Sequence, residues 1–341
     1  PRSQVGACTR QLEDTSRAQV RLAVDYGAGR LASADDEPHL VVVAVPPDVI
    51  ADVVASELAR FPDAVVTDVA SVKLAPLHEL RERGIDLTRY IGSHPLAGRE
   101  RGGAISARSD LFIGRPWVVC RDEETRPADL AVVEGLALDL GAMPIEMTPE
   151  EHDRSVAVVS HVPQLVSSLL AARLREAPEQ SLGLAGQGVR DTTRIAASAP
   201  GLWVQILGAN SEPVVEVLDQ LAADLGRVAD ALRDPDAAGS RRTIADTIQR
   251  GNEGVGRLPG KHGQKRRFEH LVVMVDDTPG QLARLFSDLG ALGVNVEDLR
   301  LEHSPGAPFG LAEISVEPAI VAQATAGLEE RGWRMAGTSN E

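Results

Sequence analysis

Polar residues that could do acid–base chemistry gather in two stretches of the first hundred residues. One stretch is Asp68-Val69-Ala70-Ser71-Val72-Lys73, and the other, about twenty residues later, is Ser93-His94-Pro95-Leu96-Ala97-Gly98-Arg99-Glu100. Together they supply a hydroxyl, an ammonium, an imidazole and a carboxylate. An imidazole has a reference pKa of about 6.5, so it can be neutral and accept a proton near pH 7. The combination predicts redox chemistry on an anionic substrate.

Short valine-rich segments must position these residues. The apolar runs at 40–45 and 64–69 flank a helical segment over roughly 48–60. Runs of this kind are typical of parallel strands that are buried on both faces of a nucleotide-binding α/β sheet. Ligands of such sheets bind outside the carboxyl ends of the strands. Because Ser71, Lys73 and His94 follow predicted strand ends, we expect them to meet at one crevice.

Composition limits the class of protein. The chain has 341 residues, 43% apolar and 25% charged, which is enough for two or three cores. A net charge of −15 and a pI near 5.0 argue against a nucleic-acid partner. The two cysteines, Cys8 and Cys120, lack the spacing of a disulfide framework or metal site. No apolar stretch approaches the roughly 18 residues of a membrane span and no signal peptide is recognised, so we expect a cytoplasmic protein with no membrane partner.

The pattern divides the chain into four segments. Residues 1–147 are α/β and end with strand-like runs at 115–120 and 142–147, and residues 148–250 are helical. The helical segment opens on Thr148-Pro149-Glu150-Glu151, which has the pattern of a capping box. Apolar residues recur later at helical spacing: Val214, Val217, Leu218, Leu221, Leu225, Val228 and Leu232. This stripe needs a partner helix from the same chain or a second one, so we expect at least a dimer.

The last two segments are a linker and a small α+β domain. Residues 251–267 are rich in glycine and basic residues, which is typical of a solvated linker. Residues 268–337 fit a strand-helix-strand-strand-helix-strand order, a ferredoxin-like pattern. Its strands are predicted at 270–275, 294–302, 311–316 and 333–336, and its helices at about 281–292 and 319–331. Thr278-Pro279-Gly280-Gln281 predicts a second capping box. Since the domain carries no catalytic set, we expect it to bind a ligand.

Four motifs spread over the chain occur together in a known family. They are Ser71-Val72-Lys73; His94-Pro95-Leu96-Ala97-Gly98; Glu151-His152-Asp153 with Ser160-His161-Val162-Pro163; and Arg190-Asp191-Thr192-Thr193-Arg194-Ile195-Ala196. In this order they resemble the prephenate/arogenate dehydrogenases of tyrosine biosynthesis. Asp277-Thr278-Pro279-Gly280-Gln281-Leu282 with Gly293-Val294-Asn295-Val296 resembles an ACT regulatory domain.

The resemblance implies a fold and an activity. The fold would be an α/β Rossmann-like parallel sheet, an all-helical dimerisation domain and an α+β ferredoxin-like ACT domain. The activity would be the NAD-dependent oxidative decarboxylation of prephenate to 4-hydroxyphenylpyruvate, or the corresponding reaction of arogenate. No metal is expected.

The resemblance also implies roles for single residues. His94 would accept the proton of the substrate hydroxyl, since an imidazole suits that task. Ser71 would share the hydrogen bond of that hydroxyl and lie beside the cofactor, although it could also cap a following helix. Arg194 would bind a substrate carboxylate with its planar, two-pronged guanidinium. Asp191, three residues earlier, would hold that guanidinium in place, although the two could simply form a surface pair.

Further positions complete the substrate set with open alternatives. Glu100 would lie near the pocket mouth, and Lys73 would contact the substrate or the cofactor, or be a solvated surface residue. Gln164 stands where many members have a histidine, which leaves the choice between prephenate and arogenate open. His161 would support residues that touch the substrate. His152 lies nine residues before it, on the opposite face of a straight helix that Pro163 should kink, so its support is weaker.

The start of the chain departs from a dinucleotide-binding pattern. Gly27-Ala28-Gly29-Arg30-Leu31-Ala32 fits G-x-G-x-x-A, but a predicted helix over 16–26 precedes it, so we interpret these glycines as a helix stop. Asp14 resembles the acidic residue that binds ribose hydroxyls about 20 residues after the glycine-rich turn. Only thirteen residues precede Asp14, so we expect the first strand and turn to be truncated, misassigned or replaced by residues 1–11. Asp14 favours NAD over NADP, although Arg17 could admit a 2′-phosphate.

Two hypotheses of different class remain. In the first, the chain is a dehydrogenase whose tail binds an aromatic amino-acid effector at Asp277, Gly280, Leu282 and Asn295. In the second, the cofactor turn is lost and the chain is a non-catalytic relative that binds an effector or a partner. The set of catalytic and substrate-binding residues favours the first.

Overall fold

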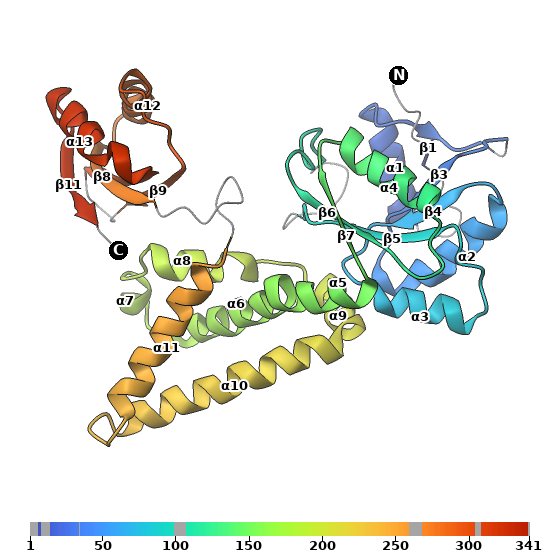
Figure 1. The fold of residues 1–341 in the computed structure, drawn as a ribbon, viewed down its shortest axis with the longest axis horizontal. Coiled ribbons are helices and arrows are strands. Elements are labelled where there is room, and N and C mark those ends of the chain that lie inside the picture. The colour runs from blue at the N-terminus through green and yellow to red at the C-terminus, as the bar shows by residue number, and fades with distance from the viewer. Residues whose placement is uncertain are drawn as a thin grey trace. The chain divides into compact units, whose positions relative to one another are not determined.

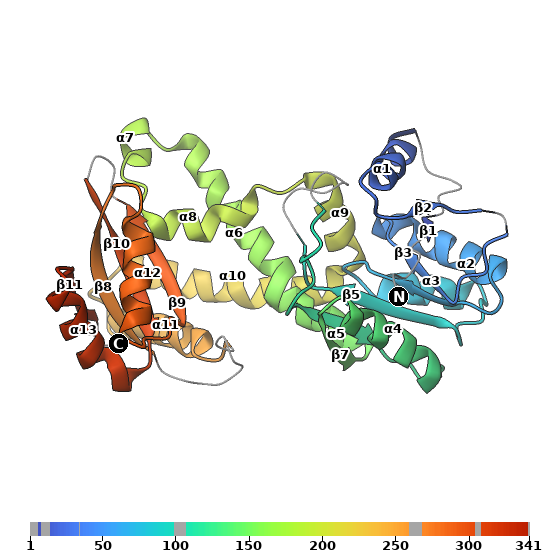
Figure 2. The ribbon, with the colours of Figure 1, turned by 90° about the horizontal axis from the view of Figure 1, so that it is seen from above.

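The computed structural model describes residues 6–7, 14–33, 35–98, 107–258, 268–303 and 308–339. These residues form two compact units (Figures 1 and 2). The first comprises Pro1–Leu182 and Thr192–Ala222, and the second Gly183–Asp191 and Ala223–Glu341.

A five-stranded sheet organises the first unit. Its strands lie in sequence order: β3 (Leu40–Val43), β4 (Val65–Asp68), β5 (Tyr90–Pro95), β6 (Pro116–Cys120) and β7 (Met143–Met147). The first three are parallel, as predicted, and β6 pairs with β7 in parallel but with β5 antiparallel. The parallel prediction is therefore wrong for the β5–β6 pair. His94 also lies within β5 and not after its end, because the strand continues to Pro95.

Helices cover both faces of this sheet (Figure 1). They are η1 (Pro47–Val49), α2 (Ile50–Arg60), α3 (Leu74–Glu82) and α4 (Pro127–Asp139). One core joins α2 and α3 to the sheet through Val54, Leu80 and Val66, which are fully buried. A second core joins α4 to the sheet through Val133 and Ile91. Burial on both faces explains why the strands read as continuous apolar runs.

The start of the chain forms a small parallel unit. Strands β1 (Gly6–Ala7) and β2 (Arg30–Leu31) pair in parallel on either side of α1 (Asp14–Asp25). The helix ends at Gly27, whose φ is 78°, while the N–H of Ala28 donates to the carbonyl of Ala23 at 3.0 Å. This is the geometry of a glycine helix stop, so that interpretation is confirmed. The interpretation of Leu12-Glu13-Asp14 as the end of a strand is wrong for Asp14, which is the first residue of α1, and residues 12 and 13 lie outside the described residues.

The helical segment begins at the predicted capping box. Thr148 Oγ1 accepts from the N–H of Glu151 at 3.1 Å, and Glu151 Oε2 accepts from the N–H of Thr148 at 2.9 Å. The elements that follow are α5 (Pro149–Val156), π-helical η3 (Ala157–His161), α6 (Val162–Arg173), η4 (Leu174–Glu176), α7 (Glu179–Leu182), α8 (Gln187–Thr193), η5 (Arg194–Ala196), α9 (Pro200–Ala209), α10 (Ser211–Arg233) and α11 (Ser240–Val255). Helix α11 continues past residue 250, so the start of the predicted linker is helical.

One long apolar helix contradicts the prediction that no apolar stretch approaches the length of a membrane span. The continuous helix from Pro149 to Glu176 is long and apolar enough, by length and composition alone, to cross a membrane. The prediction that no apolar stretch approaches that length is therefore wrong. Its apolar residues face two environments: Ala157 and Val162 are buried in a core with Val214 of α10, whereas Val159 and Leu169 are exposed.

The apolar stripe of α10 is packed in its first turns and partly exposed further along. Val214, Val217 and Leu218 pack against the core of η3 and α6. Further along, Leu225 is 68% and Leu232 60% exposed.

An antiparallel sheet with two helices forms the end of the second unit. Its elements are β8 (Glu269–Asp276), α12 (Gln281–Ala291), β9 (Asp298–His303), β10 (Phe309–Val316), η6 (Pro318–Ile320), α13 (Val321–Glu330) and β11 (Arg334–Ser339), and the strand order is β11-β8-β10-β9. The predicted order of strands and helices is confirmed. The capping box at Thr278 is wrong: α12 starts after Gly280, whose φ is 91°, with no side-chain cap. Backbone freedom of glycine, and not a side-chain oxygen, starts this helix.

Candidate active site

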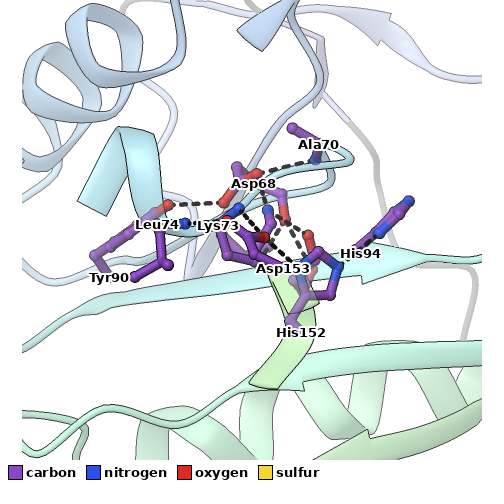
Figure 3. Close-up of polar contacts among 10 residues, drawn as sticks. Asp68, Ala70, Lys73, Leu74, Tyr90, His94, His152 and Asp153 are labelled. Atoms are coloured by element: carbon purple, nitrogen blue, oxygen red, sulfur yellow. Dashed lines mark hydrogen bonds and ion pairs between the residues drawn. The ribbon is translucent and has the colours of Figure 1, made fainter. Parts of the chain in front are cut away.

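A buried ion pair lies at the carboxyl end of β4 (Figure 3). Lys73 is 1% and Asp68 0% exposed, and Lys73 Nζ donates to Asp68 Oδ1 and, at 2.7 Å, to the carbonyl of Ser93. The Tyr90 hydroxyl donates to Asp68 Oδ2 at 2.7 Å, and the N–H of Ala70 donates to Asp68 Oδ1 at 2.9 Å. Burial, followed by the charge of Asp68, raises the pKa of Tyr90 well above its usual value. The phenol therefore stays a proton donor.

These contacts correct both predicted roles of Lys73. A side chain that is 1% exposed is neither a solvated surface residue nor free to reach a substrate in this structure. Its ammonium instead balances the charge of Asp68 beneath the loop that carries Ser71. The sequence analysis assigned Asp68 no role, although its position directly after a buried valine run was the available signal.

Gly92 provides the space for the lysine stem. A Cβ built on Gly92 would lie 3.2 Å from Cδ of Lys73 and 3.5 Å from Oδ2 of Asp68. We expect Gly92→Ala to lower the free energy of unfolding by roughly 1–3 kcal/mol, because extra volume in a packed site forces its neighbours to shift. Urea unfolding measures the change. Gly135→Ala in α4 is the control, since its Cβ would meet nothing within 4 Å and should not destabilise. Equal effects from both variants would contradict this packing argument.

Two histidines and an aspartate form a chain of contacts beside the ion pair. His94 Nδ1 lies 2.8 Å from His152 Nε2, and His152 Nδ1 lies 2.7 Å from Asp153 Oδ1. The two rings meet edge to face, with centroids 5.1 Å apart. His152 and Asp153 are fully buried, whereas His94 is half-buried. His94 is therefore the most exposed member of this series of contacts (Figure 3).

Asp153 also fixes the start of α3. Its carboxylate accepts from the backbone N–H groups of Lys73 at 2.9 Å and Leu74 at 3.0 Å. These are first-turn donors that need a partner, and a negative charge at a helix N-terminus is favourable. Asp153 on α5 therefore supplies the cap that Ser71 was expected to provide. Ser71 itself is half-buried in the loop between β4 and α3.

Burial keeps His94 neutral. Loss of hydration lowers the pKa of His94 well below 6.5, and electrostatic coupling to His152, Lys73 and His161 lowers it further. A neutral imidazole near pH 7 has one nitrogen lone pair with which to accept a proton. This state fits the predicted base.

The π-helical turn brings the second histidine of the long helix toward the same place. Asn210 Nδ2 donates to the carbonyl of Asp153 at 2.8 Å and lies 3.0 Å from His161 Nδ1. The opposite-face argument for His152 and His161 assumed a straight α-helix, but η3 is π-helical and changes the phase between them. His152 is therefore central to the site, and nothing in the sequence pattern indicated Asn210.

His161 is held as a neutral group. It is 1% exposed, and its ring meets Trp203 edge to face at 6.1 Å. Burial lowers the pKa of His161 to about 4, and the charge of His152 adds to that effect while that of Asp153 opposes it. Trp203 is half-buried in α9.

The remaining predicted residues occupy different places. Gln164 is buried, and its Oε1 accepts from Ser198 Oγ at 3.4 Å, which ties the segment after η5 to α6. Arg194 is exposed at the first residue of η5, and Asp191 accepts from Gln187 Nε2 at 2.8 Å within α8. The pairing of Asp191 with Arg194 stays a prediction. Glu100 lies outside the described residues.

Known proteins share both halves of this arrangement. Residues 5–146 match the family described as prephenate dehydrogenase, nucleotide-binding domain, and residues 148–245 match prephenate dehydrogenase, dimerization domain. A relative from Streptomyces niveus named "Probable prephenate dehydrogenase NovF" is 36% identical over 94% of this chain and 91% of its own length. The prephenate dehydrogenase of Bacillus subtilis is 26% identical over 89% of this chain and 83% of its own.

A solved structure agrees in fold with these relatives. The prephenate dehydrogenase from A. aeolicus, crystallised with hydroxyphenyl propionate and NAD+, aligns with a TM-score of 0.61 and 27% identity over 70% of this chain and 87% of that one. The residue ranges matched to the two family domains, 5–146 and 148–245, contain His94, His152 and Asp153. With its nucleotide-binding sheet, its helical segment and the histidine pair between them, the chain belongs to the prephenate dehydrogenase family.

Proposed function

We propose that this protein is a prephenate dehydrogenase that uses NAD to oxidise and decarboxylate prephenate to 4-hydroxyphenylpyruvate. The observation that carries this proposal is the neutral, half-buried His94 at the carboxyl end of the sheet, backed by a buried His152–Asp153 pair. The family of the chain supports the same reaction.

His94 would act as the base of the reaction. The hydroxyl proton of the substrate passes to the imidazole, a hydride leaves the carbinol carbon, and the ring carboxylate departs as CO2 while its bonding electrons complete the aromatic ring. Bound NAD would supply the acceptor of that hydride. Because aromatisation drives the reaction, the protein mainly orients the reactants and handles this one proton.

The described residues fit a dinucleotide in part. The carboxyl ends of the parallel strands β3, β4 and β5 lie at one edge of the sheet, where such sheets bind nucleotides. The β1–α1–β2 unit places Asp14 at the start of its helix, and there it would bind the ribose hydroxyls. Lys73 balances the charge of Asp68 below this edge, so that charge does not oppose an anionic cofactor. The preference for NAD over NADP rests only on the acidic side chain predicted for this role, Asp14.

Ser71 would orient the substrate hydroxyl beside His94. Two anchors fix its loop: the N–H of Ala70 donates to Asp68, and the N–H of Lys73 donates to Asp153. Since Ser71 lies between these anchored groups, its position is set by the same network that holds the histidines. A hydroxyl placed in this way can bind the substrate and lie beside the cofactor.

Arg194 would bind a carboxylate of the substrate, with Asp191 steadying it. We expect Arg194→Gln to raise KM by about 10–100-fold and to change kcat little, since a charge-assisted bond contributes roughly 1.5–3 kcal/mol. Steady-state kinetics measure both values. The control is Arg83→Gln on the exposed end of α3, where the arginine pairs with Asp52 and Glu79. An unchanged KM in the Arg194 variant would contradict this role.

The side chain of the substrate is the open choice. Gln164 would face it, and its neutral amide can hydrogen-bond either the keto group of prephenate or the amino group of arogenate, whereas Glu100 stays a prediction for the pocket mouth. The test is NAD reduction by the purified chain with each substrate in turn, alongside a binding titration with NAD. Turnover of prephenate supports the proposal, turnover of arogenate alone assigns the other substrate, and a folded protein with neither turnover nor NAD binding would be the non-catalytic relative.

The C-terminal sheet would act as an ACT-like effector domain. Asp277 lies just after β8, Gly280 starts α12, Leu282 packs against the core, and Asn295 bonds Glu297 before β9. A helix start of this kind can receive the carboxylate of an aromatic amino acid. Titration with tyrosine, followed by the change in activity, tests this effector role; no binding would contradict it.

The helical segment would form a homodimer. Leu225 and Leu232 of α10 and Val159 and Leu169 of the long helix leave apolar surface exposed, which a second copy would cover. The matched dimerization domain supports this assignment. The relatives are biosynthetic enzymes, and we place this protein in the cytoplasm on composition. Light scattering of the purified chain measures its oligomeric state.

A further inference from the structure

The contacts around Asp153 determine where its neighbours carry their protons. An ionised carboxylate only accepts hydrogen bonds. Asp153 accepts from the N–H groups of Lys73 and Leu74, and the atom that lies 2.7 Å away, His152 Nδ1, must therefore carry a proton to donate. A neutral His152 then has a bare lone pair on Nε2.

This lone pair determines which ring nitrogen of His94 carries the proton. His152 Nε2 and His94 Nδ1 are 2.8 Å apart, a hydrogen-bond distance that two facing lone pairs would not tolerate. His94 Nδ1 must therefore carry the proton and donate. Its other nitrogen, Nε2, keeps the lone pair.

We propose that His152 and Asp153 are positioning residues that hold His94 in its Nδ1–H tautomer, so that Nε2 is the atom that takes the substrate proton. The proposal rests on the proposed function and adds the residues that prepare its base. An unrestrained neutral imidazole populates both tautomers, and the one with the proton on Nε2 cannot accept there. A buried aspartate fixes a catalytic histidine in this way in serine proteases, where the contact is direct; here a second imidazole lies between them.

The proton balance needs no further step. The substrate O–H bond breaks, the proton joins His94 Nε2, and Nδ1 keeps its own proton while donating to His152. The resulting positive charge is stabilised by the nearby carboxylate of Asp153, which burial makes more effective. As CO2 departs, the electrons of the broken bond aromatise the ring and place negative charge on the former carbinol oxygen, and His94 Nε2 returns the proton to that oxygen to give the phenol.

The arrangement has a defined response to pH. The charged and titratable groups around His94 are His152 and Asp153 on α5, Lys73 before α3, and His161 on η3. A proton added to His94 blocks Nε2, and a proton added to His152 Nε2 turns the acceptor of His94 Nδ1–H into a donor. Either event removes the base, so kcat should be constant near neutral pH and fall only at pH values well below 6.5, because burial lowers the pKa of His94.

Variants of His152 separate tautomer control from packing. We expect His152→Ala to lower kcat by about 10–100-fold with KM changed less than about 3-fold, as for other residues that orient a catalytic group. His152→Gln should recover most of the loss, because its amide oxygen can accept from His94 Nδ1–H and its amide nitrogen can donate to Asp153. His78→Gln on the exposed face of α3 is the control. Wild-type kcat in the Ala variant, or a Gln variant as slow as it, would overturn the proposal.

A substitution of Asp153 tests the buried end of the His94–His152–Asp153 contacts. Asp153→Asn exchanges one acceptor atom for a donor, so the amide can no longer accept from all three N–H groups. If its nitrogen turns toward His152, the tautomers of both histidines reverse. We expect a fall in kcat at least as large as in His152→Ala, with unfolding monitored because the cap of α3 is also weakened.

Nitrogen NMR of the histidine side chains tests the tautomer directly and without turnover. In the cofactor-free wild-type protein above about pH 7, His94 and His152 should both carry their proton on Nδ1. His94 with its proton on Nε2 would overturn the proposal even if every variant failed to fold. Because this measurement needs no substrate, an inactive protein with the expected tautomers would refute the proposed function and leave the tautomer assignment standing.

Discussion

Replacing His94 by asparagine should lower kcat by about 10²–10⁴-fold, the range for loss of a general base. Asparagine can still hydrogen-bond a hydroxyl, so KM should change little, but its amide has no lone pair basic enough to take the proton. His94 is suited to the role because burial keeps it neutral and because its partners hold it at the accessible end of a buried chain. Initial rates at saturating prephenate and NAD measure the effect.

A surface histidine provides the control for this variant. His78→Asn alters an exposed residue of α3 and should keep the wild-type kcat. The unfolding curve of the His94 variant shows whether the fold is retained. A folded His94→Asn protein with wild-type kcat would exclude His94 as the base.

Replacing Lys73 by methionine should lower the free energy of unfolding by about 3–5 kcal/mol, the usual cost of leaving one partner of a buried ion pair alone. Methionine keeps much of the packed stem above Gly92 but removes the charge that balances Asp68. The carboxylate would keep only the hydrogen bonds from Tyr90 and Ala70. Urea unfolding of the wild type and the variant at neutral pH measures the difference.

Two further variants separate charge from packing at this site. In Lys73→Met/Asp68→Asn the uncompensated charge is gone, so part of the lost stability should return. Arg83→Met removes exposed ion pairs with Asp52 and Glu79 and should change the free energy of unfolding far less than Lys73→Met. If Lys73→Met lowers the free energy of unfolding no more than Arg83→Met does, the buried ion pair does not stabilise the fold.

The sequence by itself determined most of the elements and predicted His94 as the base. Strands β3 and β4 follow from their valine runs, because such runs are stable only when buried on both faces. The first turn of α5 follows from Thr148 and Glu151, whose capping contacts lie within four residues. The order of elements from β8 to β11 follows from local periodicity, and His94 follows from its motif.

The tertiary structure decided which residues surround that base. His152 meets His94 because α5 packs against α3 and β6, and η3 then changes the phase at which His161 follows, which no local propensity predicts. Asp153 caps α3 from about eighty residues away, and Lys73 is buried because Gly92 on the neighbouring strand leaves room for it. Local patterns determine where helices and strands form because their contacts lie within a few residues. Burial and charge pairing arise only when distant segments pack, so only the folded chain showed what holds His94 in place.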